Sequence, residues 1–193
     1  GLLYSRETIE LISEMADAGL LPSLIVDPVI VNRHGEPLYD GTTVDLIRRR
    51  LIPKALVITP NHLEAFRILG DEINDDVEAL SPAAQRLAAM GPSLVALTGG
   101  RRDTPSMVDV VAYEGEVNFL EVERCLTSNV RGTGDTFSAA IAAGIAKGAS
   151  PLDAVKKAQV FTSEAVRRAA TWKLGSGEGP IDHLGQLNAA GLD

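Results

Sequence analysis

The turn Gly132-Thr133-Gly134-Asp135 is the part of the sequence best suited to chemistry, and it opens an alanine-rich apolar run that ends at Lys147. Glycines let a backbone approach a ligand closely and adopt conformations that a Cβ disfavours. A helix that begins here directs free N–H groups and its positive dipole end toward a phosphate or another anion. Asp135 then either caps the helix or accepts a proton from a hydroxyl group that attacks a phosphoryl group. The local sequence leaves both roles open.

Polar residues also stand at or directly after the ends of three short apolar runs, over residues 23–27, 55–59 and 93–98. In an open parallel sheet, ligands bind beyond the carboxyl ends of the strands. We therefore expect these polar residues on one rim, with the turn at 132–135 above it. The candidates are Asp27, Asn61, Glu64, Thr98 and Gly99.

Each of these rim residues also has a purely structural interpretation. Asn61 and Glu64 are three residues apart at a helix start, where they either organise a hydrated Mg²⁺ ion or form a capping box. Asp27 either positions a metal or phosphate, or simply belongs to an Asp-Pro turn. The Thr98-Gly99 pair either approaches a nucleotide or ends a strand.

Around these candidates the sequence alternates between strand and helix patterns. This order predicts an α/β fold with a parallel sheet and right-handed crossovers, in a single domain over residues 1–193. Gly99-Gly100 is expected to break the third strand, and a final short helix is expected after the tail at 175–180. The predicted strands cover 23–27, 55–59, 93–98, 107–113 and 116–123, and the predicted helices cover 5–18, 42–51, 62–69, 82–90 and 151–170, besides the one after Asp135.

Composition narrows the classes of function. The 193 residues carry a formal net charge of −8 with no Lys/Arg cluster, which argues against a nucleic-acid surface. No apolar run approaches membrane-spanning length. Cys125 is the single cysteine, which excludes a disulfide framework and a thiolate zinc site, so we expect a cytoplasmic protein. The start at Gly1 without an initiator Met resembles the end of a strand, and we expect a longer protein.

Taken together, these segments resemble the ribokinase-like small-molecule kinases, whose anion-hole motif is similar to residues 132–135. Four further matches point to the branch of hydroxymethylpyrimidine and phosphomethylpyrimidine kinases of thiamine synthesis. The resemblance covers essentially the whole chain in order, and the four matches in register make it specific. They are 27–31 (DPVIV) with Gly35 and Pro37-Leu38, 57–61 (VITPN) with Glu64-Ala65, 97–100 (LTGG), and the tail 175–183.

The resemblance implies a ribokinase-like α/β fold: a mostly parallel sheet flanked by helices in three layers, incomplete at the N-terminus. It also implies transfer of phosphate from ATP, with Mg²⁺, to the hydroxymethyl group of 4-amino-5-hydroxymethyl-2-methylpyrimidine or to its monophosphate. Asp135 would be the catalytic base, and the N–H groups of Gly132, Thr133 and Gly134 would form the anion hole.

The resemblance assigns the remaining roles residue by residue. Asn61 and Glu64 would organise Mg²⁺ and phosphate, with Asp27 nearby. Thr98, Gly99 and Gly177 would line the nucleotide, and Arg33 would belong to a loop over the phosphates. A small-molecule substrate and a homodimer are the expected partners.

The sequence departs from the thiamine branch at three places. That branch commonly carries Cys at the position of Asp135, whereas Asp is the base of the wider superfamily, so pyridoxal kinase is the nearest alternative. Asn32-Arg33-His34 stands where the branch tends to have Ala-Lys-Ser, and Arg and Lys are not equivalent. Ile181-Asp182-His183 replaces Val-Asn-His.

Two further alternatives follow from the resemblance. In this family the first strands, with most of the acceptor pocket, precede the position of Gly1. A catalytically inactive remnant that binds nucleotide or serves in an assembly is therefore the second hypothesis. A general Rossmann-like binding domain is the third, and the lack of a dinucleotide fingerprint weighs against it.

Overall fold

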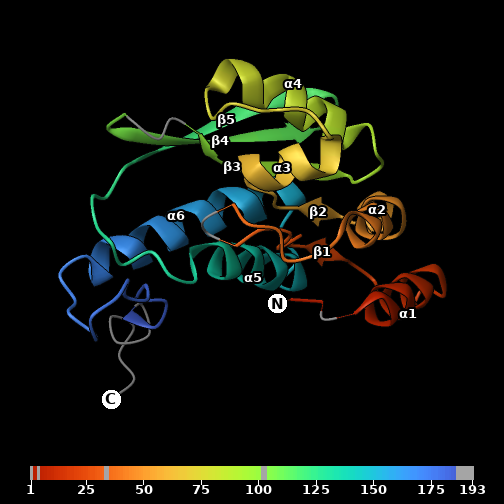
Figure 1. Cartoon of the computed structure of the whole chain (residues 1–193). Coiled ribbons are helices and arrows are strands. Elements are labelled where there is room, and N and C mark those ends of the chain that lie inside the picture. The colour runs from red at the N-terminus through yellow and green to blue at the C-terminus, as the bar shows by residue number, and fades with distance from the viewer. Residues whose placement is uncertain (1, 4, 33–34, 101–103, 186–193) are drawn as a thin grey trace. The chain divides into compact units, whose positions relative to one another are not determined.

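The chain forms two compact units in the computed structural model, residues 1–121 and residues 122–193 (Figure 1). The structure describes residues 2–3, 5–32, 35–100 and 104–185. The single domain over residues 1–193 stays a prediction.

A five-stranded sheet organises the first unit, with the strand order β1-β2-β3-β4-β5. Its first three strands are parallel neighbours, and β4 pairs antiparallel with β3. The predicted hairpin of β4 and β5 is confirmed; its turn residues Glu114 and Gly115 both have positive φ, which suits the right-handed twist of the strands. The strands are β1 (Ile25–Val26), β2 (Val57–Ile58), β3 (Leu94–Gly100), β4 (Ser106–Tyr113) and β5 (Glu116–Glu123), whose last two residues fall in the second unit.

Side-chain caps fix where the helices of the first unit begin. The cap residues are Ser5, Asp40, Asn61 and Asp76, and each accepts a backbone N–H from the first turn of its helix. The predicted helices over 5–18, 42–51 and 62–69 are confirmed. The helices are α1 (Arg6–Asp17), α2 (Gly41–Arg50), the short 3₁₀ helix η1 (Ile52–Lys54), α3 (His62–Leu69) and α4 (Val77–Ala88).

The hydrophobic core of the first unit lies between this sheet and its helices. Both α3 and α4 pack against β3, and α4 also packs against β4 (Figure 1). Fully buried side chains of the helices meet those of the strands, among them Ile68, Leu80, Leu87, Val95, Leu97 and Val110. An α/β fold with a mixed sheet flanked by helices is therefore confirmed.

The start of α4 differs from the prediction. The helix begins at Val77 and not at Pro82, because Asp76 caps it and accepts the N–H of Ala79 at 2.7 Å. Pro82 lies in the second turn, where its missing N–H removes a single hydrogen bond of the helix. The proline therefore marks no boundary.

The predicted strand break at Gly99-Gly100 is also wrong. The third strand continues through Gly100, and its register shifts between Leu97 and Gly100, which is the signature of a β-bulge. Gly99 has φ +86°, and its N–H donates to Oδ1 of the buried Asp109 at 3.1 Å. The glycine pair thus bends the strand where the sequence indicated an end.

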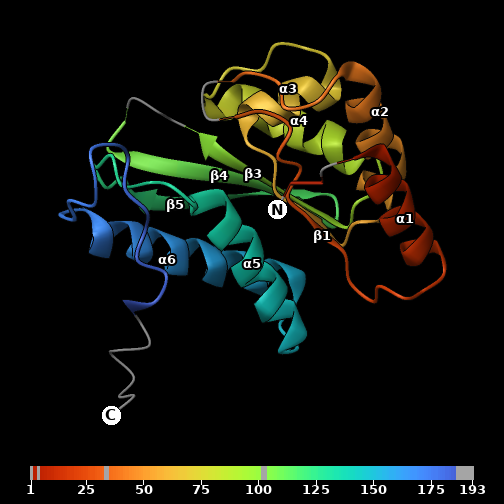
Figure 2. The same cartoon turned by 60° about the horizontal axis from the view of Figure 1, so that its bottom comes forward.

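Two helices, α5 (Thr133–Ala146) and α6 (Pro151–Ala169), pack side by side in the second unit (Figure 2). They approach closely at Gly144, where an added Cβ would lie 3.1 Å from the Cβ of Ala154. The helix predicted over 151–170 is confirmed, whereas the short helix predicted after the tail falls mainly on residues 186–193, outside the described residues. The three-layer arrangement stays a prediction, since its third layer would come from these two helices.

No helix among the described residues is both long enough and apolar enough to span a membrane.

Candidate active site

The rim of the sheet in the first unit carries the predicted residues of the parallel strands. Asn61 and Thr98 form a parallel bridge just beyond β2 and within β3, and the Thr98 N–H donates to the carbonyl of Pro60 at 2.9 Å. Asp27 directly follows β1, which pairs with β2. Because the three strands are parallel neighbours, these residues share the carboxyl edge of the sheet.

A reciprocal capping box joins Asn61 and Glu64 at the start of α3. The Asn61 Oδ1 atom accepts the N–H groups of Leu63 at 2.9 Å and of Glu64 at 3.0 Å. The Glu64 Oε2 atom accepts the N–H of Asn61 at 3.0 Å. The structural interpretation of this pair is therefore present, and it leaves further lone pairs on the carboxylate for a ligand.

Glu64 also holds the segment that follows β1. Its Oε1 atom accepts the N–H of Ile30 at 3.2 Å, and only 4% of the residue is exposed. The preceding residue, Val29, has φ +41°, an unfavourable backbone conformation for a β-branched side chain. Such strain persists where the surrounding contacts fix the chain, and it occurs often at ligand sites.

The electrostatics of this rim centre on Glu64. Burial is the chief cause that raises the pKa of its carboxyl group from 4.5 to about 7. The nearby negative charge of Asp27 also raises the pKa, whereas the hydrogen bonds from Asn61 and Ile30 partly offset both effects. A neighbouring cation would reverse this balance by favouring the charged form.

Asp27 and Glu64 are the residues of this rim that could bind Mg²⁺. Within the described ranges, no three His, Cys, Asp or Glu side chains come together as a metal cage. Mg²⁺ does not require one, since in kinases it is held by one or two carboxylates, waters and substrate phosphates. Asp27 and Glu64, which interact electrostatically, match that smaller donor set.

The turn at 132–135 builds the start of α5. Gly132 occupies the cap position with φ +86°, where it has no side chain to cap the helix. The Thr133 N–H and the Thr133 Oγ1 atom both donate to the carbonyl of Val130, at 3.2 and 2.6 Å. Among the described residues, the N–H groups of Gly132, Gly134 and Asp135 donate to no protein acceptor, so they are free to donate to an anion.

Asp135 lies in the first turn of α5 with its side chain exposed. Gly132, and not Asp135, is the cap residue of the helix. In the part of the second unit that the structure describes, no hydrogen bond or ion pair engages the carboxylate of Asp135. An exposed carboxylate without a structural partner beside free N–H groups suits a general base.

The glycine-rich tail lies beside the segment that leads into this turn. The Arg131 N–H donates to the Gly179 carbonyl at 3.1 Å, and the Ile181 N–H donates to the Arg131 carbonyl at 3.3 Å. Gly177 is exposed and stands two residues before Gly179. The second unit therefore brings the predicted nucleotide segment and the predicted anion hole together.

Asn129 and Asp109 are buried polar residues that sequence reasoning missed. Asp109 fixes the bulge at Gly99, and Asn129 accepts the N–H of Gly179 at 3.0 Å. Their partners lie 10 and 50 residues away along the chain, so no local pattern could have indicated them.

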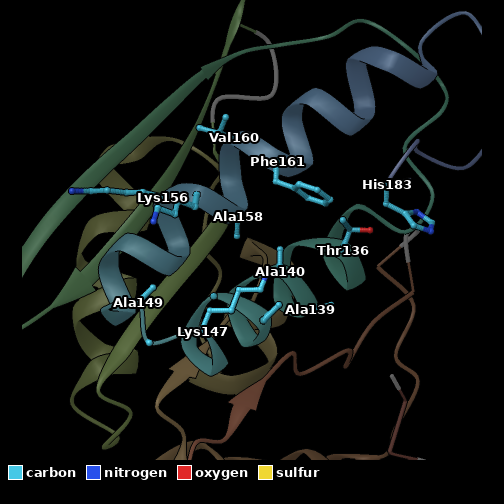
Figure 3. A pocket seen from close by; sticks show the side chains of 14 residues that line it. Thr136, Ala139, Ala140, Lys147, Ala149, Lys156, Ala158, Val160, Phe161 and His183 are labelled. Atoms are coloured by element: carbon cyan, nitrogen blue, oxygen red, sulfur yellow. The ribbon is translucent and has the colours of Figure 1, made fainter. Parts of the chain in front are cut away.

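A groove of about 1090 Å³ runs along α5 and α6 (Figure 3). None of the predicted site residues lines it. On the right of this view lie the Phe161 ring, Thr136 and His183. The other lining residues include Ala139, Ala140, Ala143 and Gly144 of α5 and Lys156, Lys157 and Val160 of α6.

Two parts of the predicted site are not described by the structure. Arg33 lies outside the described residues. The rim of the first unit and the turn of the second unit are described separately, so their meeting in one site stays a prediction.

Comparison with known proteins shows the family to which the chain belongs. The model of the family described as phosphomethylpyrimidine kinase matches residues 1–182. The chain belongs to the phosphomethylpyrimidine kinase family. The resemblance seen in the sequence is thereby confirmed.

Two curated relatives carry names from thiamine synthesis. The hydroxymethylpyrimidine/phosphomethylpyrimidine kinase of Streptomyces coelicolor is 35% identical over 183 residues, which cover 95% of this chain and 66% of that protein. The thiamine biosynthesis bifunctional protein ThiED of Geobacter sulfurreducens is 35% identical over 184 residues, which cover 95% of this chain and 37% of that protein. The chain thus spans only part of the length of these relatives.

A solved structure supports the fold. The ADP complex of Bacillus subtilis pyridoxal kinase matches with a TM-score of 0.87 and 33% sequence identity, covering 95% of this chain and 68% of that chain. The predicted ribokinase-like fold class is confirmed by this similarity together with the family.

Proposed function

We propose that the protein containing this chain is an ATP-dependent small-molecule kinase. Its acceptor is the hydroxymethyl group of 4-amino-5-hydroxymethyl-2-methylpyrimidine, the monophosphate of that compound, or both. The observation that carries the proposal is the first turn of α5, where free N–H groups adjoin the exposed and unpartnered carboxylate of Asp135. Membership of the phosphomethylpyrimidine kinase family supports it.

Asp135 is the proposed general base. Its carboxylate takes the proton of the acceptor hydroxyl, or of the acceptor monophosphate, as the acceptor oxygen bonds to the γ-phosphorus of ATP. The bond from that phosphorus to the bridging oxygen breaks, and ADP leaves with the bonding electrons. Negative charge on the transferring group is stabilised by N–H groups of the anion hole proposed at Gly132, Thr133 and Gly134, of which Thr133 also donates to the Val130 carbonyl.

The rim residues supply positioning and charge in this proposal. Asp27, Asn61 and Glu64 would hold Mg²⁺ and phosphate, and the ion when bound would neutralise charge on the phosphates. Asn61 and Glu64 also fix each other through the capping box, so the site would be preorganised before substrate binds.

The nucleotide is the second substrate. Thr98, Gly99 and the tail at Gly177 are proposed to line it, with Arg33 in the loop over its phosphates. Gly99 has no side chain at the bulge, which suits close approach by a ligand. The complex of Bacillus subtilis pyridoxal kinase with ADP supports a nucleotide site in this fold. A homodimer and a cytoplasmic location stay predictions.

Pyridoxal phosphorylation is the second candidate function. Asp135 favours it, because the thiamine branch that the sequence resembles commonly carries Cys at this position. The similarity to Bacillus subtilis pyridoxal kinase is a further argument for this acceptor. A nucleotide-binding protein without transferase activity is the third candidate.

A comparison of acceptors tests these candidates. The full coding sequence that contains residues 1–193 is expressed, and ADP formation is measured with hydroxymethylpyrimidine, its monophosphate and pyridoxal. The proposal predicts the highest kcat/KM with a pyrimidine. A preference for pyridoxal would transfer the assignment to the second candidate. Binding of ATP in calorimetry without ADP formation from any acceptor would favour the third.

A further inference from the structure

The side chain of Asn129 is buried where the end of α6, the glycine-rich tail and the approach to the 132–135 turn come together. Its Nδ2 atom donates to the carbonyls of Ala169 at 2.7 Å and Trp172 at 2.9 Å. Its Oδ1 atom accepts the N–H of Gly179 at 3.0 Å. Both amide protons and the carbonyl oxygen are thus used, and the residue is 5% exposed.

The tail fits against Asn129 without room for a side chain. A Cβ placed on Gly179 would overlap the Oδ1 atom of Asn129, and it would lie 2.8 Å from the Cγ atom. The φ of Gly179 is not in the left-handed region, so backbone conformation does not require a glycine here. The close approach of Asn129 does. Any side chain here would push the tail away from the turn.

Backbone hydrogen bonds extend this attachment on both sides of Asn129. Arg131 and Pro180 form a parallel bridge, with hydrogen bonds from the Arg131 N–H to the Gly179 carbonyl and from the Ile181 N–H to the Arg131 carbonyl. Thr127 adds a second link to the end of α6: its Oγ1 atom donates to the Ala170 carbonyl at 3.2 Å and accepts the N–H of Asn129 at 3.1 Å.

The chain on either side of this attachment leads to the two proposed functional segments. Gly132 begins the turn three residues after Asn129, and Gly177 stands two residues before Gly179. The Asn129 side chain therefore connects, through three residues on one side and two on the other, a proposed anion hole to a proposed nucleotide segment.

We propose that Asn129 is a positioning residue that fixes the spacing between the tail at 175–179 and the turn at 132–135. This inference rests on the proposed kinase function, in which the tail holds the nucleotide while the turn receives its transferring phosphoryl group. A reacting group displaced by about 1 Å can lower a rate roughly 100-fold. Asn129 acts through these segments and does not touch the substrate.

The substitution Asn129→Asp tests this role with little change in size. It keeps an oxygen for the Gly179 N–H and replaces the donating Nδ2 with an oxygen that faces two carbonyls. The matched control is Ser150→Ala, which removes the cap of α6 in the same unit and leaves the turn and the tail untouched. The full coding sequence is used for both variants.

The first readout compares the change in kcat with the change in the Kd of ATP. Asn129→Asp is expected to lower kcat by about 10- to 100-fold at saturating ATP, with a smaller change in the Kd of ATP. Ser150→Ala is expected to keep kcat. Equal kcat losses in the two variants at equal loss of Tm would show a merely structural role. If Asn129→Asp does not fold, Gly179→Ala disturbs the same attachment from the side of the tail and is measured in the same way.

The second readout needs no activity. Amide hydrogen exchange is measured over residues 132–135 and 175–181. Asn129→Asp is expected to speed exchange in both segments together, whereas Ser150→Ala leaves both unchanged. Faster exchange in one segment alone would overturn the link. If the parent protein phosphorylates none of the three acceptors, the proposed function fails, and the exchange result then decides the link by itself.

Discussion

Glu64 and Asn61 hold each other through two hydrogen bonds of 3.0 Å, each from the backbone N–H of one residue to the side chain of the other. Glu64 alone of the pair also reaches Ile30, beyond the neighbouring strand. A residue proposed to organise Mg²⁺ and phosphate is therefore also a structural link. Substitution of Glu64 must consequently be judged by stability as well as by activity.

The first prediction concerns the pH dependence of stability. Since burial chiefly, and Asp27 next, raise the pKa of Glu64 from 4.5 to about 7, the folded state binds this proton more tightly than the unfolded state. The contribution of Glu64 to stability is complete below pH 4.5 and is lost as the pH rises through 7, amounting to about 3 kcal/mol at most. Glutamine cannot titrate. The stability of the parent protein relative to Glu64→Gln should therefore fall across this window.

Chemical denaturation of both proteins from pH 4.5 to 8 measures this difference. Gln also leaves one of the two N–H groups facing its amide without an acceptor, which adds a roughly pH-independent cost of about 1–3 kcal/mol. Glu14→Gln on the exposed face of α1 serves as control and should show no such trend. A difference that stays constant or grows with pH would contradict the assignment of this pKa.

The second prediction concerns the interaction between the two acids of the rim. Because the charge of Asp27 raises the pKa of Glu64, Asp27→Asn should lower that pKa toward its ordinary value, while burial keeps it above that value. Carbon-13 NMR titration of the Glu64 carboxyl group measures the shift directly. Asp45→Asn on α2 is the control. An unchanged titration of Glu64 in Asp27→Asn would show that the two carboxylates do not interact.

The third prediction concerns the bulge in β3. An added Cβ at Gly100 would lie 2.7 Å from Leu80 Cδ1 and 2.8 Å from the carbonyl oxygen of Val108. The backbone oxygen cannot move without disturbing the strand pairing, so Gly100→Ala should lower the free energy of unfolding by about 1–3 kcal/mol.

Urea denaturation measures this cost, with Gly41→Ala as the control. Gly41 is the first residue of α2 and has open space around its Cα, so alanine should be neutral or slightly stabilising there. Equal stability of Gly100→Ala and the parent protein would mean that the bulge accommodates a side chain despite the close approach of Leu80 and Val108.

Sequence patterns predicted the bounds of those helices whose ends are fixed by residues close by in the chain. The bounds of α3 agree with the sequence because the helix starts at the capping pair of Asn61 and Glu64 and ends at Gly70, whose φ is +81°. In contrast, the run 23–27 yields only a two-residue strand, Ile25–Val26, since a strand extends only as far as its neighbour offers partners. Apolar character alone does not fix that length.

The rest of the site could not be read from the sequence because it depends on contacts between distant segments. Asp109 supports Gly99, and Asn129 supports Gly179, yet neither side chain belongs to a recognisable pattern. The strained backbone at Val29 is likewise invisible locally, since the bond from Ile30 to Glu64 spans 34 residues. The motif residues could be predicted from the sequence because turns and helix caps favour particular residue types, such as Gly, Asn and Asp.

The role of Asp135 as the base of a phosphoryl transfer is measured by the kcat of Asp135→Asn. Asp153→Asn is a closely matched control, because Asp153 is also an exposed third residue of a helix, in α6. Both substitutions should change the free energy of unfolding by less than about 1 kcal/mol. If Asp135 is the base, Asp135→Asn should lower kcat by about 10²- to 10⁴-fold with the preferred acceptor, while Asp153→Asn keeps it. Unchanged turnover in Asp135→Asn would show that Asp135 is not the base.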